Sequence, residues 1–225
     1  GKKAILQHYY LQQESLNSYH LGFQQVFQNE KSRYLNKTFS FGGKLCSQEI
    51  HIDLAGQEAS CDLSGLFLPY QNQQNNFNLF INHNASKTSS QQFFKSIASD
   101  NAKNSFQGKV IIQPNVSFID AKQISKNLLL SKLAEINVRP QLEIYHDQVS
   151  CSHGATIGQL DEDALFYMQS RGISLSQAKL MLTFAFAHEI TQKIQLNFLK
   201  NYLEQQIESR LELISTAPEQ RNADG

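Results

Sequence analysis

Two patterns of apolar and polar residues divide the chain near residue 150. Before that point, short apolar runs alternate with turns rich in Gly, Asn, Ser and Asp, which is typical of many short β-strands. After Gly158 the apolar positions recur at helical spacing. We therefore expect a strand-rich body over residues 1–157 and a helical subdomain over residues 158–225. The clearest strand-like runs are LFLP (66–69), FNLFIN (77–82), KVIIQP (109–114) and QLEIYH (141–146).

The N-terminal stretch HYYLQQESLNSYHLGFQQVF (8–27) fits either a helix or strands. Its aromatic and β-branched residues favour strands. Asn and Gln are common throughout the body, where they suit tight corners and stacked amide ladders. The spacing between strand-like runs is irregular, so the sequence shows no strict repeat and leaves a solenoid, a sandwich or a barrel open.

The segment LDEDALFYMQSRG (160–172) has the charge order of a capped helix. It opens with the acidic run 161–163 and closes with Arg171 before Gly172. Acids at the N-terminus and a base at the C-terminus both offset the helix macrodipole, and glycine commonly follows a helix end. The carboxylate pair in this run is therefore better explained by the helix than by catalysis.

A second helical region follows from Leu175 to about Ile214. Ser174 with Gln177 three residues later resembles a capping box. The region predicts one long helix or two helices with a break near Asn197, and we expect its last ten residues, TAPEQRNADG, to be disordered. The apolar positions at helical spacing are Leu180, Phe184, Ala187, Ile190 and Ile194.

Composition excludes several classes of protein. The chain carries 20 Lys and Arg against 20 Asp and Glu, whereas proteins that bind nucleic acid through its phosphates usually have a basic excess. No apolar run is long enough to span a membrane, and no signal-peptide core is present. The first residue is Gly1 rather than methionine, so we expect further residues upstream. Three widely spaced cysteines argue against a disulfide framework and for a reducing cytoplasm.

Cys151 and His153, in the stretch SCSHGATIG (150–158), are the main candidates for chemistry. In an extended chain, residues two apart point to the same face, so both side chains can address one site. A thiolate and an imidazole are good ligands for soft or borderline metals, including iron in clusters. The alternative is a small buried cysteine beside a hydrogen-bonded histidine, because a single C-x-H spacing is a weak signal.

Other candidate sites are weaker still. A cysteine protease would pair Cys151 with His51, His83 or His146, but no local nucleophile signature supports this. We expect the remaining histidines, His8, His20 and His188, to be structural. No CxxC zinc motif, GxGxxG loop or GxxxxGK[ST] loop is present.

Longer blocks of the chain resemble the SufB/SufD family of iron–sulfur cluster assembly proteins. The blocks are RPQLEI, CSHGAT.G.LD, LFY..SRGI and A...L..AFA.E, in this order, and the earlier stretch from Asn82 to Pro114 also matches. The form CSHGATIG resembles the SufD branch. The resemblance covers most of the chain and thins before about residue 45 and after about residue 195.

The resemblance implies a fold and a function. The fold is mainly β: a right-handed parallel β-helix body followed by a helical C-terminal subdomain. The implied function is a scaffold subunit that is not an enzyme alone and acts with a SufB-like subunit and a SufC-like ABC ATPase in the cytoplasm. An iron–sulfur cluster forms transiently at the interface with SufB, and this chain binds none tightly by itself.

The resemblance also places the functional residues. His153 matches the histidine of the SHGAT block, a participant at the cluster-forming interface, as a metal ligand or a source of protons or hydrogen bonds. Cys151 matches the cysteine of that block and carries less weight. The ATPase docks on the helical subdomain, where the block LFY..SRGI supplies Leu165, Phe166, Tyr167, Arg171 and Gly172.

Two other functional classes remain open. The same fold hosts carbohydrate-active enzymes, which use acid–base carboxylates in a groove. A β-helix also has exposed edge strands that invite pairing with a like chain. Without a SufB-like partner, such a chain is expected to form a homodimer.

Overall fold

The chain folds into two units, which a computed structural model describes over residues 1–216. The first unit, Gly1–Gly158, is built of strands, and the second, from Gln159 onward, is built of helices. The boundary between the two units falls at Gly158. The strands are β1 (Ile5–Gln12), β2 (Tyr19–Gln28), β3 (Arg33–Ser40), β4 (Leu45–Leu54), β5 (Ser60–Phe67), β6 (Gln74–His83), β7 (Ser89–Ala98), β8 (Lys103–Ile112), β9 (Ile119–Leu129), β10 (Glu135–Ile144) and β11 (Val149–Gly158).

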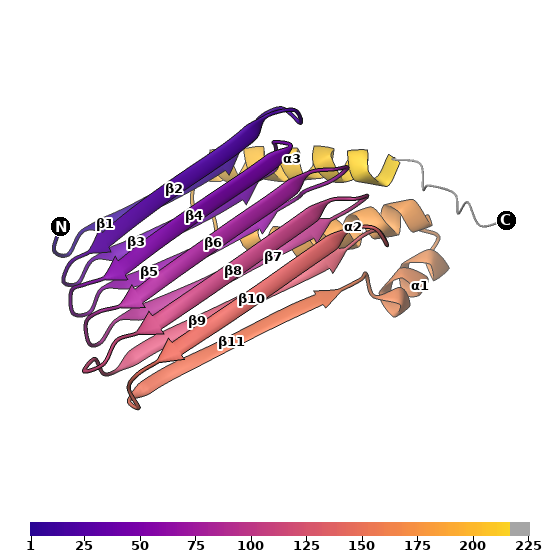
Figure 1. The fold of residues 1–225 in the computed structure, drawn as a ribbon. Helices are drawn as coiled ribbons and strands as arrows, with labels where there is room; N and C mark the ends of the chain where they lie inside the picture. Colours follow the sequence, from indigo (N-terminus) through magenta and orange to yellow (C-terminus); the bar gives the residue numbers. More distant parts are fainter. Residues whose placement is uncertain (217–225) are drawn as a thin grey trace. The chain divides into compact units, whose positions relative to one another are not determined.

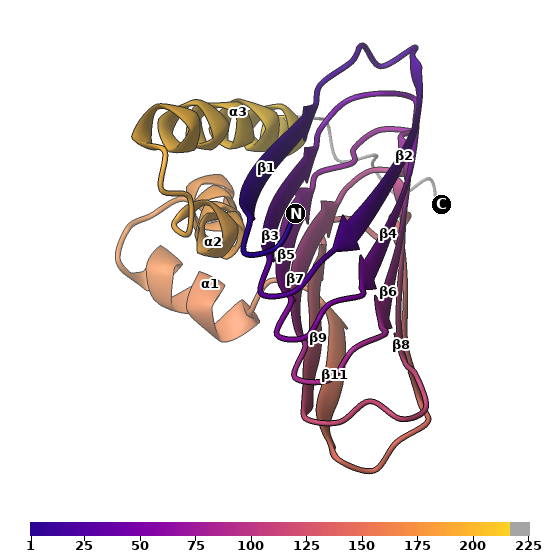
Figure 2. The ribbon, with the colours of Figure 1, turned by 90° about the vertical axis from the view of Figure 1, so that its left-hand side faces the viewer.

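The first unit is a parallel β-helix with two sheets. Odd-numbered strands form a sheet in the order β1-β3-β5-β7-β9-β11, and even-numbered strands form a second in the order β10-β8-β6-β4-β2. Successive strands alternate between the sheets, so two strands complete one turn, and Figure 2 shows the two sheets face to face. The β-helix body is confirmed, and so are strands in the ambiguous N-terminal stretch, which becomes β1 and β2 (Figure 1).

A structural repeat of roughly 30 residues runs through this unit, although the sequence shows no strict repeat. The repeat is visible in the backbone conformation of the corners between strands. Lys3, Lys31, Glu58 and Lys87 have φ of 56°, 56°, 60° and 61°, and each lies two positions before a strand of the six-stranded sheet. Each corner also bonds to the next turn through its backbone, as when Lys31 N–H donates to the Gln57 carbonyl at 2.9 Å. Backbone conformation repeats here while residue type does not.

Alternate residues of the central strands fill the space between the sheets. Phe77, Leu79 and Ile81 of β6 are at most 1% exposed. The Phe77 ring lies 5.2 Å from that of Phe94, which lies 4.8 Å from that of Phe106, measured between centroids. Full burial of one such side chain stabilises the fold by about 2–3 kcal/mol. This core fixes β8 and β9, on which the last strands, β10 and β11, pair.

The second unit contains helices where the sequence predicts them: α1 (Glu162–Ser170), α2 (Leu175–Thr191) and α3 (Asn197–Thr216). The Asp161 carboxylate accepts hydrogen bonds from the N–H groups of Asp163 and Ala164, and the Ser174 hydroxyl accepts one from Gln177 N–H. The Ser174 cap was predicted, whereas the acidic start of α1 was predicted only from the helix macrodipole. The second helical region is two helices with a break before Asn197, and residues 217–225 of the expected disordered tail lie outside the described residues.

Within this unit, α2 and α3 are joined by a polar contact between a histidine and a glutamate. His188 Nδ1 lies 2.8 Å from Glu204 Oε1, and the His188 ring stacks on Phe184. His188 therefore has a structural role, as its sequence context suggested. Along the described helices, none is long and apolar enough to cross a membrane.

Candidate functional site

The strand β11 carries Cys151 and His153 and forms one edge of the six-stranded sheet. It pairs with β9 alone, with Cys151 opposite Ala121 and His153 opposite Gln123. Ala121 and Gln123 are buried inside the β-helix, so the register places Cys151 and His153 on the same inward side of the sheet. By strand register, the two residues therefore lie on one face of the sheet, as their spacing in the sequence predicts.

Their environments nevertheless differ. Cys151 is half-buried and packs against the hydrophobic core beside Val149. Burial raises the pKa of the Cys151 thiol; a hydrogen bond with the Ala121 backbone opposes this shift, and Asp120 adds to it. A protonated thiol is a poor nucleophile and a poor metal ligand. Cys151 consequently behaves first as a small core residue, in keeping with the lower weight that the sequence gives it.

His153 is exposed and lies two positions further along β11. It is the more accessible of the two candidate ligands, since Cys151 is half-buried. Among the described residues, no group of three or more His, Cys, Asp or Glu side chains is placed to hold a metal ion. In the described part of this chain, His153 offers one ligand and not a complete set.

The histidines that a protease would need are engaged elsewhere. His83 is buried and bonds Thr88 and Ser90 through its two ring nitrogens, at 2.7 and 2.9 Å. His51 Nε2 pairs with Glu49 Oε1 at 2.6 Å. The third candidate, His146, accepts a hydrogen bond from the backbone of Gln148. The structure thus assembles no Cys–His pair around Cys151 from these three residues.

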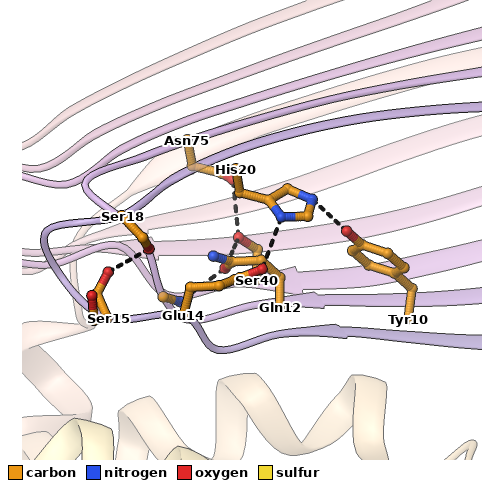
Figure 3. Close-up of polar contacts among 9 residues, drawn as sticks. Tyr10, Gln12, Glu14, Ser15, Ser18, His20, Ser40 and Asn75 are labelled. Carbon is orange, nitrogen blue, oxygen red and sulfur yellow. Dashed lines mark hydrogen bonds and ion pairs between the residues drawn. The ribbon is translucent and has the colours of Figure 1, made fainter.

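A second polar cluster, near the other end of the β-helix, was not anticipated (Figure 3). His20 Nδ1 lies 2.8 Å from Glu14 Oε1, and its Nε2 forms a short hydrogen bond with the Tyr10 hydroxyl. Burial raises the pKa of Tyr10 to about 12, with Cys46 and then Glu14 adding to the shift. Tyr10 is therefore held protonated and donates to the imidazole, which in turn donates to Glu14.

This Tyr10–His20–Glu14 chain closes the corner between β1 and β2. Nearby, the Ser40 hydroxyl lies 3.1 Å from the side-chain oxygens of both Gln12 and Asn75 (Figure 3). The Ser40 contacts join residues of three successive turns, so no local spacing in the sequence predicts them. The cluster lies on β1 and β2, whereas His153 lies on β11 at the opposite edge of the sheet order, so the two do not form one site.

The residues expected at the ATPase contact lie on and just after α1. Phe166 and Tyr167 are 74% and 59% exposed, and Leu165 is half-buried. The Arg171 guanidinium lies 5.3 Å from the centroid of the Tyr167 ring, and Gly172 ends the segment with φ of 86°. The helix therefore presents an aromatic surface beside a cation.

Comparison with known proteins gives a consistent result. A family model described as "SUF system FeS cluster assembly, SufBD core domain" matches residues 1–186. Iron-sulfur cluster assembly protein SufD of Escherichia coli is 33% identical over 208 residues, which are 92% of this chain and 49% of that protein. The chain spans about half the length of the relatives it matches.

Two further relatives have a similar sequence identity to this chain. An iron-sulfur cluster assembly SufBD family protein of Synechocystis is 32% identical over 93% of this chain and 46% of its own length. Protein ABCI7, chloroplastic, of Arabidopsis thaliana is 34% identical over 85% of this chain and 41% of its own. The family match includes the whole β-helix and α1, and hence both candidate surfaces.

Proposed function

Because the chain belongs to the SufB/SufD family of iron–sulfur cluster assembly proteins, and to its SufD branch, we propose that it is a scaffold subunit on which a cluster is built together with a SufB-like partner. The observation that carries this proposal is the position of His153. It is an exposed imidazole on the inward side of an edge strand, and residues 1–216 place no group of three or more metal-binding side chains around it.

The edge strand supports a site shared between two chains. The outer side of β11 has no strand partner in the described part of the molecule, so its backbone N–H and C=O groups can pair with a strand of another protein. Such pairing would bring the partner's side chains next to His153. Imidazole binds iron well, and it serves as a cluster ligand where cysteine is replaced. The nascent cluster is then a cargo of the assembly and not a tightly bound cofactor of this chain.

The ATPase contact belongs to the same proposal. A SufC-like ATPase docks on the aromatic surface of α1, around Phe166, Tyr167 and Arg171. Aromatic side chains and arginine are the residues that most often dominate binding energy at protein interfaces. The chemical work of ATP hydrolysis lies in that partner, so this chain acts as an accessory subunit.

Co-expression with SufB-like and SufC-like partners, followed by iron and sulfide counts on the purified complex, tests the proposal. We expect His153→Ala to leave the complex intact but to lower its iron and sulfide content by about tenfold, since one ligand or proton-transfer group is removed. The matched control is His51→Ala, which removes an imidazole from the outward side of β4. A His153→Ala complex with the iron and sulfide content of the unchanged complex would refute the role of His153.

The carbohydrate-active alternative has less support. The carboxylate pair that suggested it, Asp161 and Asp163, lies at the start of α1, where Asp161 accepts two backbone N–H groups. A general acid needs a free carboxyl group beside a substrate groove. The pair is accounted for by helix capping.

A further inference from the structure

A column of inward-facing side chains ends at His153. The strand register places Gln92 of β7 opposite Gln123 of β9, and Gln123 opposite His153 of β11. Gln92 and Gln123 are 2% and 3% exposed. The two amides therefore form a buried polar row that leads directly to the exposed imidazole.

Within this row the two amides share one hydrogen bond, and each has one polar atom without a partner among the described residues. Gln123 Nε2 donates to Gln92 Oε1 at 3.2 Å. Gln123 Oε1 and Gln92 Nε2 have no hydrogen-bond partner among the described residues. A buried polar atom without a partner is costly, so each one needs an explanation. The unused oxygen belongs to Gln123, the residue directly beside His153.

The opposite sheet leaves room for the two amides. A Cβ atom at Gly108 of β8 would lie 3.0 Å from Gln123 Nε2 and 3.2 Å from Gln92 Oε1. A side chain at this position would require the two amides to shift. The pair thus occupies a space that the strand across the β-helix keeps free.

An amide on β9 can reach β11. Asn127 Nδ2 donates to the carbonyl oxygen of Thr156 on β11 at 2.9 Å. Gln123 is one methylene longer than Asn127, and neighbouring strands are about 4.8 Å apart. A glutamine amide on β9 is therefore long enough to reach the neighbouring strand β11, where the register places His153 opposite Gln123.

We propose that Gln123 is a positioning residue for His153: its Oε1 accepts a hydrogen bond from the imidazole N–H and so determines which ring nitrogen is left to bind iron. Which nitrogen of a histidine binds a metal is generally set by the hydrogen bond that the other nitrogen makes. The use of this bond in cluster assembly rests on the proposed function, whereas the bond can be tested on this chain alone.

Nitrogen NMR of the full chain labelled with 15N-histidine tests the proposal without any partner. The His153 signals are assigned by their loss in His153→Ala. In the unchanged protein we expect one neutral tautomer to dominate. Gln123→Met removes the acceptor at similar side-chain length, and it should shift the tautomer ratio by roughly fivefold, the effect of one net hydrogen bond.

Two further variants separate positioning from a general structural effect. Gln123→Asn keeps the amide but shortens it, so it should shift the ratio as Gln123→Met does. Gln48→Met changes another buried glutamine with an unused amide atom, on β4, and should leave His153 unaltered. Thermal unfolding of each variant checks that it is folded.

The possible results are distinct. A tautomer ratio that is the same in Gln123→Met as in the unchanged protein overturns the positioning role, whatever the cluster yield. A shifted ratio together with normal cluster assembly by His153→Ala leaves the positioning role standing and refutes the proposed function.

Discussion

His83 lies inside the β-helix with none of its side chain exposed. Its ring nitrogens bond the hydroxyls of Thr88 and Ser90, so one nitrogen donates and the other accepts. Burial lowers the pKa of His83 from 6.5 to about 4. The imidazole is therefore neutral in the folded protein at a pH where the unfolded chain already binds a proton.

This difference predicts a pH-dependent stability. The pKa of His83 is lower in the folded state than in the unfolded state. Its contribution to the free energy of unfolding is therefore intact above about pH 6.5 and is lost as the pH falls toward 4. Between about pH 7 and 4.5, the free energy of unfolding should fall by about 2–3 kcal/mol more in the unchanged protein than in His83→Gln. Urea unfolding followed by circular dichroism measures this, with His153→Gln as an exposed control; equal falls in the unchanged protein and His83→Gln would contradict it.

Single residues were predictable where their partners are close in sequence. The caps Asp161 and Ser174 follow from charge and spacing within one helical turn, and the structure has both. His153 was identified from its sequence block. Gln123 was not, because its relation to His153 depends on the strand register, which joins residues a full turn of the β-helix apart.

At the scale of elements, the corners determine how turns stack. Gly56 lies between β4 and β5, and a Cβ atom there would be 2.0 Å from the backbone nitrogen of Glu30 on the neighbouring turn. No side chain fits in this gap. The strands and helices follow from periodicity, whereas the repeat does not, because corners such as Lys31 and Glu58 share a backbone conformation and not a residue type.

Gly56→Ala should therefore destabilise the β-helix. Backbone atoms must move to admit the methyl group, so we expect a loss of about 2–3 kcal/mol in the free energy of unfolding. Gly154→Ala on β11 is the matched control, since a Cβ atom there meets nothing within 4 Å. Chemical denaturation of both variants gives the comparison, and equal stability of the two would show that the turns can separate without cost.

At the scale of the whole molecule, the proposed partner surfaces belong to different units. One is the edge of β11 in the β-helix unit, and the other is the aromatic surface of α1 in the helical unit. Without a SufB-like partner, we expect the same edge to pair with a second copy of this chain. The two surfaces should then be separable by mutation.

Phe166→Asp tests the second surface. It replaces an aromatic side chain that is 74% exposed with a charge, and it should weaken binding of a SufC-like ATPase by about tenfold in a calorimetric titration. Phe198→Asp on α3 is the control, because Phe198 is also 74% exposed but lies outside the proposed surface. Binding of the SufB-like partner should be unaffected in both variants. If Phe166→Asp binds the ATPase as tightly as the unchanged protein does, the contact lies elsewhere.

The one-sided pairing of β11 has a thermodynamic consequence. In a stack of turns, each strand is stabilised mainly by its neighbours on either side, so a strand with one neighbour opens more readily than those inside the stack. The strand that carries His153 is thus one of the terminal strands of its sheet. A partner that pairs with it supplies the missing neighbour, so that subunit association and the ordering of the histidine become a single cooperative equilibrium.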